Sequence, residues 1–570
     1  MNNLKQVIIK CLEEAMPTSI DDLDKFLEIP ADASRGDYAL PCFPLAKILK
    51  KSPALIAQEI KDKIVIDPQY IEKVEVVGGY LNFYGNSQTF VKHLLEDFDQ
   101  KKEKFGASNI GEGKNVVIDY SSPNIAKPFH IGHLRSTVIG GAIYRIYQFL
   151  GYHSIGVNFL GDWGVQFGKV MAGLSLWKDE YTFTEGKEID TILKIYVRYN
   201  QEEKENPELN DLAKKWLKKL EDHDDETVQT WQWIRKISLE NFQKTYRLLH
   251  SHFDSYHGEA YYNDKMQDIL DELQQKHLLK ESEGAHVVDL EEYHMPPCIL
   301  ITSAGTSIYA TRDLAALKDR AKTYDFAKAL YIVGAEQQLH FKQIFKVFEL
   351  MGYGTYAKRC EHVPFGLVVD KTGKKIGSRS GNSVVLDDII QEAIHKVKDI
   401  IQEKNPTLTD IDETARKIAV GAIIFNDLYN SRIKDEIFDW DTMLNFNGET
   451  GPYIQYMYVR TKSILHKAQY IPDLKKVHID LLLDPDSMQL LKTLALYSER
   501  VLEAAEKNEP SIVARYVMEL AKNYSNFYNR NRVLTDDVAL RETRLYITYM
   551  VQIILESGTK LLGMEMPEKM

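Results

Sequence analysis

The chain contains only four cysteines in 570 residues: Cys11, Cys42, Cys298 and Cys360. They lie far apart, without a C-x-x-C pair and without histidines at the spacing of a zinc site. This pattern argues against a disulfide framework and against a structural zinc site, so we expect no resident metal. It is typical of a protein of the reducing cytoplasm, where we place the chain.

Long apolar runs are also missing, since no stretch is long enough to cross a bilayer. The N-terminal segment MNNLKQVIIKCLEEAM is amphipathic and contains acidic residues, which a signal peptide does not. We therefore expect no membrane partner. Low-complexity sequence is absent as well, and with 44% apolar and 27% charged residues the composition is that of a soluble globular protein. A length of 570 residues predicts roughly three to five domains.

An excess of positive charge is missing too, because 71 Lys and Arg face 83 Asp and Glu, for a net charge of −12. This balance alone disfavours a nucleic-acid partner. However, residues 441–570 hold 16 basic and 17 acidic side chains, so the acidic excess lies almost wholly in the rest of the chain. A local basic face can bind RNA on an acidic protein, and the overall charge therefore does not decide.

The first 110 residues predict a small α+β domain. Apolar residues at helical spacing open the chain, and helices are expected over residues 44–51 and 53–63 after a turn-rich connection at 36–41. Two short strands follow, at residues 74–77 and 80–83. The Gly- and Lys-rich stretch GASNIGEGK then marks a linker.

Residues 111–386 predict a Rossmann-like domain with a parallel sheet. A strand at residues 115–120, a long helix ending near Gly151 and a strand at residues 154–159 form a βαβ unit. A polar helical insertion is expected at about residues 175–250. Further strands of the same sheet are expected at residues 285–290, 298–302, 329–333 and 367–369.

From residue 387 onward every segment reads as helix. We expect a connective region at residues 387–445 and an all-helical bundle at residues 446–570. The chain is thus a multidomain α/β protein with an N-terminal α+β domain, a Rossmann-like parallel-sheet domain and a C-terminal helical bundle.

The most informative segment is SSPNIAKPFHIGH, between the first strand of the sheet and its helix. Phosphates bind helix N-termini at this place in such folds. His130 and His133 can donate hydrogen bonds to a triphosphate, and Gly132 allows close approach to the backbone. The alternative is a helix cap with two surface histidines.

A second element is VDKTGKKIGSRSG, which follows a short strand and is rich in glycine, serine and cations. Its composition is typical of a loop that closes over a polyphosphate, although a solvated turn has the same composition.

Together the two elements resemble the HIGH and KMSKS signatures of class I aminoacyl-tRNA synthetases. The stretches SSPNIAKPFHIGHLRST and GDWGVQFG are similar to those of the arginyl-tRNA synthetase family. GDYALPCFPLAK resembles that family's N-terminal tRNA-binding domain, and GETGPYIQYMYVR and LLGMEMPEKM resemble its anticodon-binding domain. The likeness covers nearly the whole chain in the expected order.

The resemblance implies an enzyme that activates L-arginine with Mg-ATP and transfers it to the terminal ribose of tRNA(Arg), and that needs tRNA for activation. One feature departs from the family pattern, because IGSRSG lacks the usual final lysine. A cation is needed at the pyrophosphate leaving group, and the candidates are Lys127, Lys374, Lys375 and Arg379.

The resemblance also implies an arginine site. A guanidinium has five donors and calls for carboxylates, while the α-amino and α-carboxylate groups must also be held. The positions that match the family's are Asn124, Glu259, Tyr309, Asp313 and Gln337. Gln338 is an alternative to Gln337, and without the resemblance the acidic residues would be read as solvated and Tyr309 as packing.

Aromatic and basic residues interleave in the last third of the chain, where bases can stack on aromatic rings. Core packing is the alternative for any single tyrosine. The candidates for tRNA contact are Tyr453, Tyr456, Tyr524, Tyr528, Arg530, Arg532 and, by the resemblance alone, Met570.

Three other functions remain open at this point. A class I synthetase for another amino acid, such as glutamate or lysine, would share the nucleotide signatures, although Glu259 with Asp313 favours a cationic substrate and speaks against glutamate. A small-molecule nucleotidyltransferase can carry an H-x-G-H sequence, and a non-catalytic tRNA-binding relative would share the outer domains. We expect ATP, L-arginine and tRNA(Arg) as partners, and a monomer.

Overall fold

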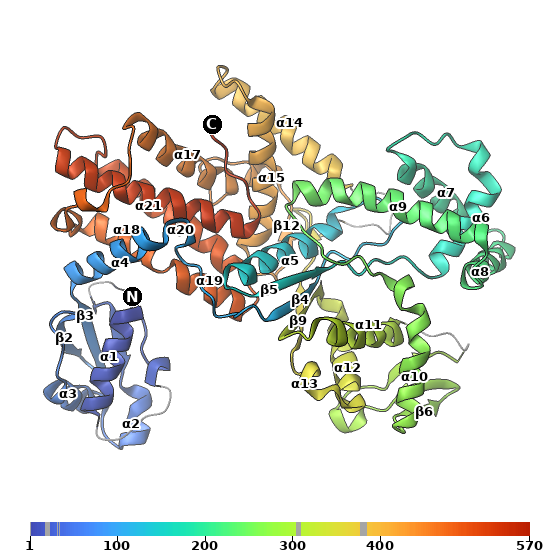
Figure 1. The fold of residues 1–570 in the computed structure, drawn as a ribbon, viewed down its shortest axis with the longest axis horizontal. Helices are drawn as coiled ribbons and strands as arrows, with labels where there is room; N and C mark the ends of the chain where they lie inside the picture. The colour runs from blue at the N-terminus through green and yellow to red at the C-terminus, as the bar shows by residue number, and fades with distance from the viewer. Residues whose placement is uncertain are drawn as a thin grey trace. The chain divides into compact units, whose positions relative to one another are not determined.

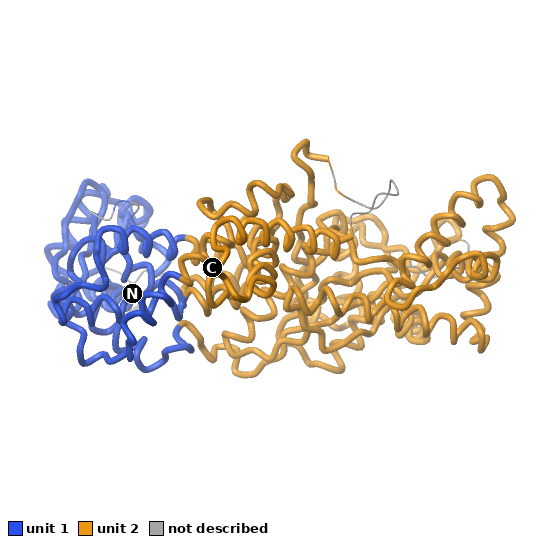
Figure 2. Tube along the Cα trace, turned by 90° about the horizontal axis from the view of Figure 1, so that it is seen from above, with its two compact units in different colours: residues 1–105, 460–498, 519–554 blue, residues 106–459, 499–518, 555–570 orange. Residues whose placement is uncertain are grey.

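The computed structural model of the chain describes residues 2–16, 23–30, 32, 35–303, 309–374, 376 and 385–570. Two compact units make up the chain (Figure 2). Unit 1 comprises residues 1–105, 460–498 and 519–554, and unit 2 comprises residues 106–459, 499–518 and 555–570. Each unit therefore combines segments that are distant in sequence.

The N-terminal part of unit 1 contains an antiparallel sheet of order β1–β3–β2 (Figure 1). Its elements are α1 (Asn2–Ala15), β1 (Tyr38–Pro41), α2 (Phe43–Leu49), α3 (Pro53–Lys63), β2 (Ile71–Val77), β3 (Tyr80–Gly85) and α4 (Ser87–Lys101). Helix α3 begins as its sequence predicts, because Ser52 accepts a hydrogen bond from the Leu55 amide and Pro53 occupies the first turn. The expected turn at residues 36–41 is wrong in its second half, since β1 pairs with β3 through buried residues.

The C-terminal third is helical, as predicted, and its longer helices contribute residues to both units. These helices are α17 (Gly451–Lys467), α19 (Tyr497–Glu506), α20 (Ser511–Arg530) and α21 (Val538–Leu562), whereas α18 (Pro485–Ala495) lies wholly within unit 1. Within unit 1, the Tyr546 hydroxyl on α21 donates to Asp99 on α4 at 2.9 Å. Lys492 on α18 pairs with Asp37 at 2.5 Å. Side-chain contacts thus join the two ends of the chain inside this unit.

Unit 2 is built on a parallel sheet of order β10–β9–β4–β5. The strands are β4 (Asn115–Asp119), β5 (His153–Val157), β9 (Lys328–Gly334) and β10 (Cys360–Phe365). Helix α5 (Ile131–Phe149) connects β4 to β5, which confirms the predicted βαβ unit. Asp119 at the end of β4 lies opposite both Val157 and Tyr331. The carboxyl ends of these strands therefore share one edge, where doubly wound sheets bind ligands.

The remaining strands do not belong to this sheet, contrary to the expectation for three of them. β7 (Ala285–Val288) and β8 (Cys298–Ile301) form a separate antiparallel sheet with β6 (Leu279–Ser282). β11 (Val368–Val369) pairs with β12 (Glu436–Ile437), a strand inside the region expected to be all helix. The edge strand β10 was not predicted, because its opening Cys360-Glu361-His362 interrupts the apolar run.

Helices cover the rest of unit 2. They are α6 (Val165–Trp177), α7 (Glu188–Glu202), α8 (Glu208–Glu221), α9 (Asp225–Leu248), α10 (Met266–Gln275), α11 (Tyr309–Tyr324), α12 (Gln338–Phe348), α13 (Gly354–Ala357), α14 (Leu386–Lys404), α15 (Ile411–Tyr429) and α16 (Trp440–Met443). Helices α6 to α9 pack on one another, in accordance with the helical insertion predicted there (Figure 1). In the described part of the chain, every helix is too short or too polar to span a bilayer.

Candidate active site

The loop that leaves β4 holds its backbone in an unusual conformation. Ser121, Ser122 and Ala126 have φ values of 70°, 46° and 63°, in the left-handed region that side chains disfavour. Hydrogen bonds offset this cost, because the Ser121 amide donates to Ser136 of α5 and the Ala126 amide donates to Ser238 of α9. Strained backbone that its surroundings hold in place is typical of a binding site.

Asn124 pairs with Gly161, which lies in the loop after β5. A β-bridge joins Asn124 to Gly161, and a Cβ atom on Gly161 would lie 1.9 Å from the Asn124 side-chain oxygen. The same segment holds the acidic part of the site, since Leu160 accepts from the Glu259 amide at 2.9 Å and Asp162 accepts from the Ala260 amide at 2.8 Å. Gly161 is therefore required where it stands, because only glycine lets these two parts meet.

His130 and His133 cap the N-terminus of α5. Nδ1 of His130 accepts from the Gly132 amide at 3.1 Å, and Nδ1 of His133 accepts from the His130 amide at 3.3 Å. Their rings stack with centroids 3.8 Å apart. Because each Nδ1 accepts a hydrogen bond, the neutral form of each ring carries its proton on Nε2.

The charge state of His133 follows from its surroundings. Burial lowers the pKa of His133 well below its ordinary value, and the nearby His130 and Lys127 lower it further. A neutral imidazole can donate from Nε2 without bringing a full positive charge. The capping prediction and the phosphate-binding prediction are thus compatible, since the caps use Nδ1 and the proton of each neutral ring lies on Nε2.

Lys127 lies just before this helix. Its ammonium group is 3.4 Å from the Gln166 side-chain oxygen and 5.1 Å from the centre of the Tyr196 ring. Both partners belong to helices α6 and α7, which therefore hold the Lys127 side chain in place.

The chain that follows the second signature element contacts the histidine segment. Val385 forms a β-bridge with His130, and the Leu386 amide donates to Phe129 at 2.9 Å. At the start of the second signature element, Asp370 accepts from the amide of Lys374 at 3.0 Å in a tight turn. The candidates Lys375 and Arg379 lie outside the described residues.

Glu259 is a buried carboxylate in a polar cluster. It opens the short helix Glu259–Lys265, is 8% exposed and lies 3.7 Å from the guanidinium of Arg312. Burial raises the pKa of Glu259 to about 7, Arg312 opposes this shift, and Asp162 and Asp313 add to it. Such a group gains most from a cationic ligand, which would remove the cost of its buried charge.

Asp313 lies close enough to Glu259 to act on its titration, and it is paired with His340 at 2.6 Å. Tyr309 and Asp313 share α11 as predicted, but Tyr309 is 68% exposed. Gln337 ends a 3-10 turn before α12, where both it and Gln338 are exposed. Arg312, the neighbour of Asp313 on α11, thus pairs with Glu259, whereas Tyr309 and Gln337 lie at the surface.

Sequence reasoning missed Arg312, His340 and Asp162 as members of this cluster. Asp162 is 1% exposed and binds Arg235 at 3.3 Å as well as the Ala260 amide. Burial raises its pKa, and the hydrogen bond from Ala260 opposes this. Its place in GDWG was a usable signal, whereas Arg312 and His340 pair with residues on other elements, and the spacing of a sequence does not show such pairs.

The tRNA candidates divide by exposure. Tyr524 is fully buried with its hydroxyl 3.5 Å from Thr548, so it packs in the core and we withdraw it. Tyr456 is 40% exposed, Arg530 pairs with Asp486 at a side-chain exposure of 70%, and Tyr528 lies under the Arg460 guanidinium. The other candidates are the half-buried Tyr453, the exposed Arg532, and Met570, whose carbonyl accepts from Asn405.

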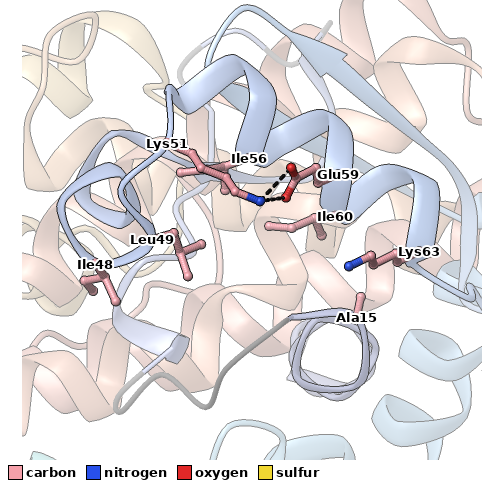
Figure 3. A pocket seen from close by; sticks show the side chains of 8 residues that line it. All are labelled: Ala15, Ile48, Leu49, Lys51, Ile56, Glu59, Ile60 and Lys63. Atoms are coloured by element: carbon pink, nitrogen blue, oxygen red, sulfur yellow. Dashed lines mark hydrogen bonds and ion pairs between the residues drawn. The ribbon is translucent and has the colours of Figure 1, made fainter.

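Unit 1 also contains a cavity of about 310 Å³ against α2 and α3 (Figure 3). Apolar side chains such as Ile56 and Ile60 form much of its wall, and Lys51 pairs with Glu59 at 2.6 Å. This ion pair neutralises a cation that a triphosphate would need, and we leave the cavity out of the site. Among the described residues, no group of three or more His, Cys, Asp or Glu side chains could hold a metal ion.

Comparison with known proteins covers the whole chain. Family models match residues 94–440 (tRNA synthetases class I (R), catalytic domain), 454–570 (DALR anticodon binding domain) and 2–84 (Arginyl tRNA synthetase N terminal domain). An arginine–tRNA ligase of Halothermothrix orenii is 46% identical over 572 residues, covering 100% of both chains. One of Clostridium perfringens is 45% identical over 567 residues, covering 99% of this chain and all of the relative. The solved structure of Thermus thermophilus arginyl-tRNA synthetase superposes with a TM-score of 0.84 at 27% identity, over 100% of both chains.

Proposed function

We infer the function from one premise: this chain belongs to the arginyl-tRNA synthetase family. We propose that it joins L-arginine to tRNA(Arg) at the expense of ATP. The observation that carries the proposal is the junction at Leu160–Gly161, where Gly161 packs against Asn124 of the nucleotide signature and the Leu160 carbonyl accepts from the backbone amide of Glu259. The family match argues against the small-molecule nucleotidyltransferase and against a synthetase for glutamate or lysine.

The proposed first step forms arginyl-adenylate. A carboxylate oxygen of arginine bonds to the α-phosphorus of Mg-ATP, and the bond from that phosphorus to the bridging oxygen breaks, so that pyrophosphate leaves with the electron pair. His130 and His133 support this step, because their Nε2–H groups can donate to phosphate oxygens as negative charge grows. A terminal ribose hydroxyl of the tRNA then attacks the arginyl carbonyl, and AMP leaves.

A cation has to stabilise the leaving pyrophosphate. Of the candidates, Lys127 and Lys374 are among the residues that the structure describes. Lys127 lies just before the histidines in the sequence, and its charge lowers the pKa of His133. We propose Lys127 for this role, with Lys374, Lys375 and Arg379 as alternatives on the second element.

The proposed arginine site uses Glu259 and Asp313 for the guanidinium and Asn124 for the α-amino end. Tyr309 and Gln337 complete it only if arginine draws their exposed side chains inward. The DALR model and the exposed Tyr456 support anticodon binding by the C-terminal helices. The four cysteines are free thiols, which supports the proposed location in a reducing cytoplasm, and we keep the monomer as a proposal.

The resemblance further implies that activation needs bound tRNA. ATP–pyrophosphate exchange tests this with the purified protein, arginine and labelled pyrophosphate. We expect almost no exchange until tRNA(Arg) is added. Fast exchange with arginine alone would refute the tRNA requirement, and absence of exchange and of aminoacylation with tRNA present would refute the function.

A further inference from the structure

Arg135 is among the largest fully buried side chains of the protein, although it is charged. It lies on α5, two residues after His133. Its Nε is 2.9 Å from an oxygen of Asp427 on α15, and the two side chains are 1% and 2% exposed. Removing two charges from water has a desolvation cost that can exceed the attraction between them, so a buried ion pair contributes little to the free energy of unfolding. Its presence therefore calls for another explanation than stability.

The pair is attached to the segment that follows α15. Nη1 of Arg135 donates to the backbone carbonyl of Lys434 at 2.6 Å. Helix α5 also packs on α15 and on β11. One arginine thus joins the helix of the histidines to the backbone just before β12.

This segment is bound along its length to the strand that enters the second signature element. The Gly366 amide donates to Arg432, the Glu436 amide to Leu367 and the Phe438 amide to Val369, at 2.9, 2.8 and 2.9 Å. The Leu367 amide donates to Asp435 at 2.7 Å. Any movement of residues 432–438 would therefore carry β11 with it.

β11 in turn sets the position of Lys374. The Asp370 side chain accepts from the amides of Thr372 and Lys374 at 2.8 and 3.0 Å, and the Ile376 amide returns to Val368 at 3.0 Å. The turn is thus held to the strand by hydrogen bonds of its own. Its place relative to the histidines depends on the attachment of β11 to α5.

We propose that Arg135 is a positioning residue, which fixes the turn Asp370–Lys374 relative to His130 and His133 through Asp427 and the backbone of Lys434. The proposal rests on the proposed function and deepens it, because it names what aligns the two ATP-binding elements. Arg135 touches no substrate. A displacement of about 1 Å at a reacting group can cost a hundredfold in rate, so alignment is enough to matter.

The test replaces both members of the pair, Arg135→Met with Asp427→Leu. An apolar pair of similar volume keeps buried sites folded in other proteins, which separates alignment from stability. Arg135→Lys is a second variant, since it keeps the charge but loses the planar fork that reaches both partners. The matched control is Arg416→Gln, because Arg416 also lies on α15 and also pairs with acids, at Glu413 and Glu565.

Three quantities are measured on the full chain: steady-state aminoacylation, arginine binding by calorimetry, and hydrogen exchange of the backbone amides. We expect kcat/KM for ATP to fall at least about tenfold in both Arg135 variants. Arginine affinity should stay within about twofold, because Glu259 and Asp313 lie on other elements. Exchange at Leu367, Glu436 and Phe438 should quicken in both, and the control should match the wild type throughout.

An unchanged kcat/KM for ATP would overturn the proposal, and so would a loss that appears equally in arginine affinity or in the control. Slow, wild-type exchange at residues 366–374 and 434–438 in either variant would overturn it as well. The hydrogen-exchange result does not depend on which reaction the protein catalyses. A wild type that fails to charge tRNA would therefore refute the proposed function while the role of Arg135 in alignment is still decided.

Discussion

The carboxylate of Glu259 and the guanidinium of Arg312 lie 3.7 Å apart, near enough for an ion pair and too far for a hydrogen bond. Arg312 thus places a guanidinium of the protein beside the Glu259 carboxylate, and we propose that the same carboxylate binds the guanidinium of the substrate arginine. Arg312 also reaches Asn263 at 3.3 Å, and both side chains of the pair are about 90% buried. Glu259 therefore keeps hydrogen-bonding capacity for a ligand that approaches more closely.

Glu259→Gln is expected to weaken arginine binding while leaving ATP binding intact. The amide keeps the shape but loses the charge, and a hydrogen bond to a charged group contributes about 1.5 to 3 kcal/mol. We expect the KM for arginine to rise roughly 10- to 100-fold by this measure, with the KM for ATP little changed. A variant with wild-type KM for arginine would remove Glu259 from the site.

Arginine binding should depend on pH near neutrality. The pKa of Glu259 is raised to about 7 by burial, with Arg312 lowering it and Asp162 and Asp313 raising it. Only the ionised carboxylate attracts a guanidinium, so affinity should fall as the pH drops below 7. Binding at pH 8 and pH 6, measured by calorimetry, should differ several-fold with proton release at the lower pH.

The same shift acts on stability with a definite sign. A raised folded pKa means that Glu259 contributes stability below its unfolded pKa of 4.5 and loses it as the pH rises towards 7. Saturating arginine should offset this loss of stability.

In Glu259→Gln, the pH dependence of arginine binding should largely disappear. If the pH dependence persisted in this variant, it would belong to another group.

His133→Ala is expected to reduce aminoacylation because it removes an Nε2 donor. Loss of one donor to a developing negative charge costs about 10²- to 10³-fold in kcat. His133→Asn keeps a side-chain amide that can cap the helix, so it separates capping from phosphate binding. Both variants should lose activity, and the melting temperature of the asparagine variant should be the closer to that of the wild type. An active alanine variant would contradict the role of His133.

Tyr456 and Tyr524 form a matched pair for the C-terminal helices. Tyr524→Ala removes a fully buried ring and should cost about 3 to 5 kcal/mol of unfolding free energy. Tyr456→Ala should leave stability nearly unchanged and raise the KM for tRNA(Arg). Chemical denaturation and charging assays on both variants would check this. Equal stability losses in the two would place Tyr456 in the core as well.

Much of the sheet could be predicted from the sequence, and so could candidates for the site, for physical reasons that individual residues illustrate. β4, α5 and β5 follow from local apolar periodicity, and His130 and Gly132 stand in one short segment. By contrast, the place of β7 and β8 depends on which strands they pair with, and local pattern carries no information on pairing. β10 was hidden because an edge strand tolerates polar residues such as Glu361.

Side-chain pairs between different helices and strands could not be predicted from the sequence either. Arg312 with Glu259 and His340 with Asp313 join different elements, and a single sequence shows only that charges are present. Tyr524 and Tyr528 lie one turn apart on α20, yet the first is buried and the second is partly exposed. Only the packing of neighbouring helices distinguishes them.

Aminoacylation of total tRNA with each of the labelled amino acids in turn is the sharpest test of the proposed substrate and of the role of Glu259. We expect incorporation of arginine alone, dependent on ATP and strongly reduced in Glu259→Gln. Incorporation of another amino acid, or arginine charging that is indifferent to Glu259, would contradict it.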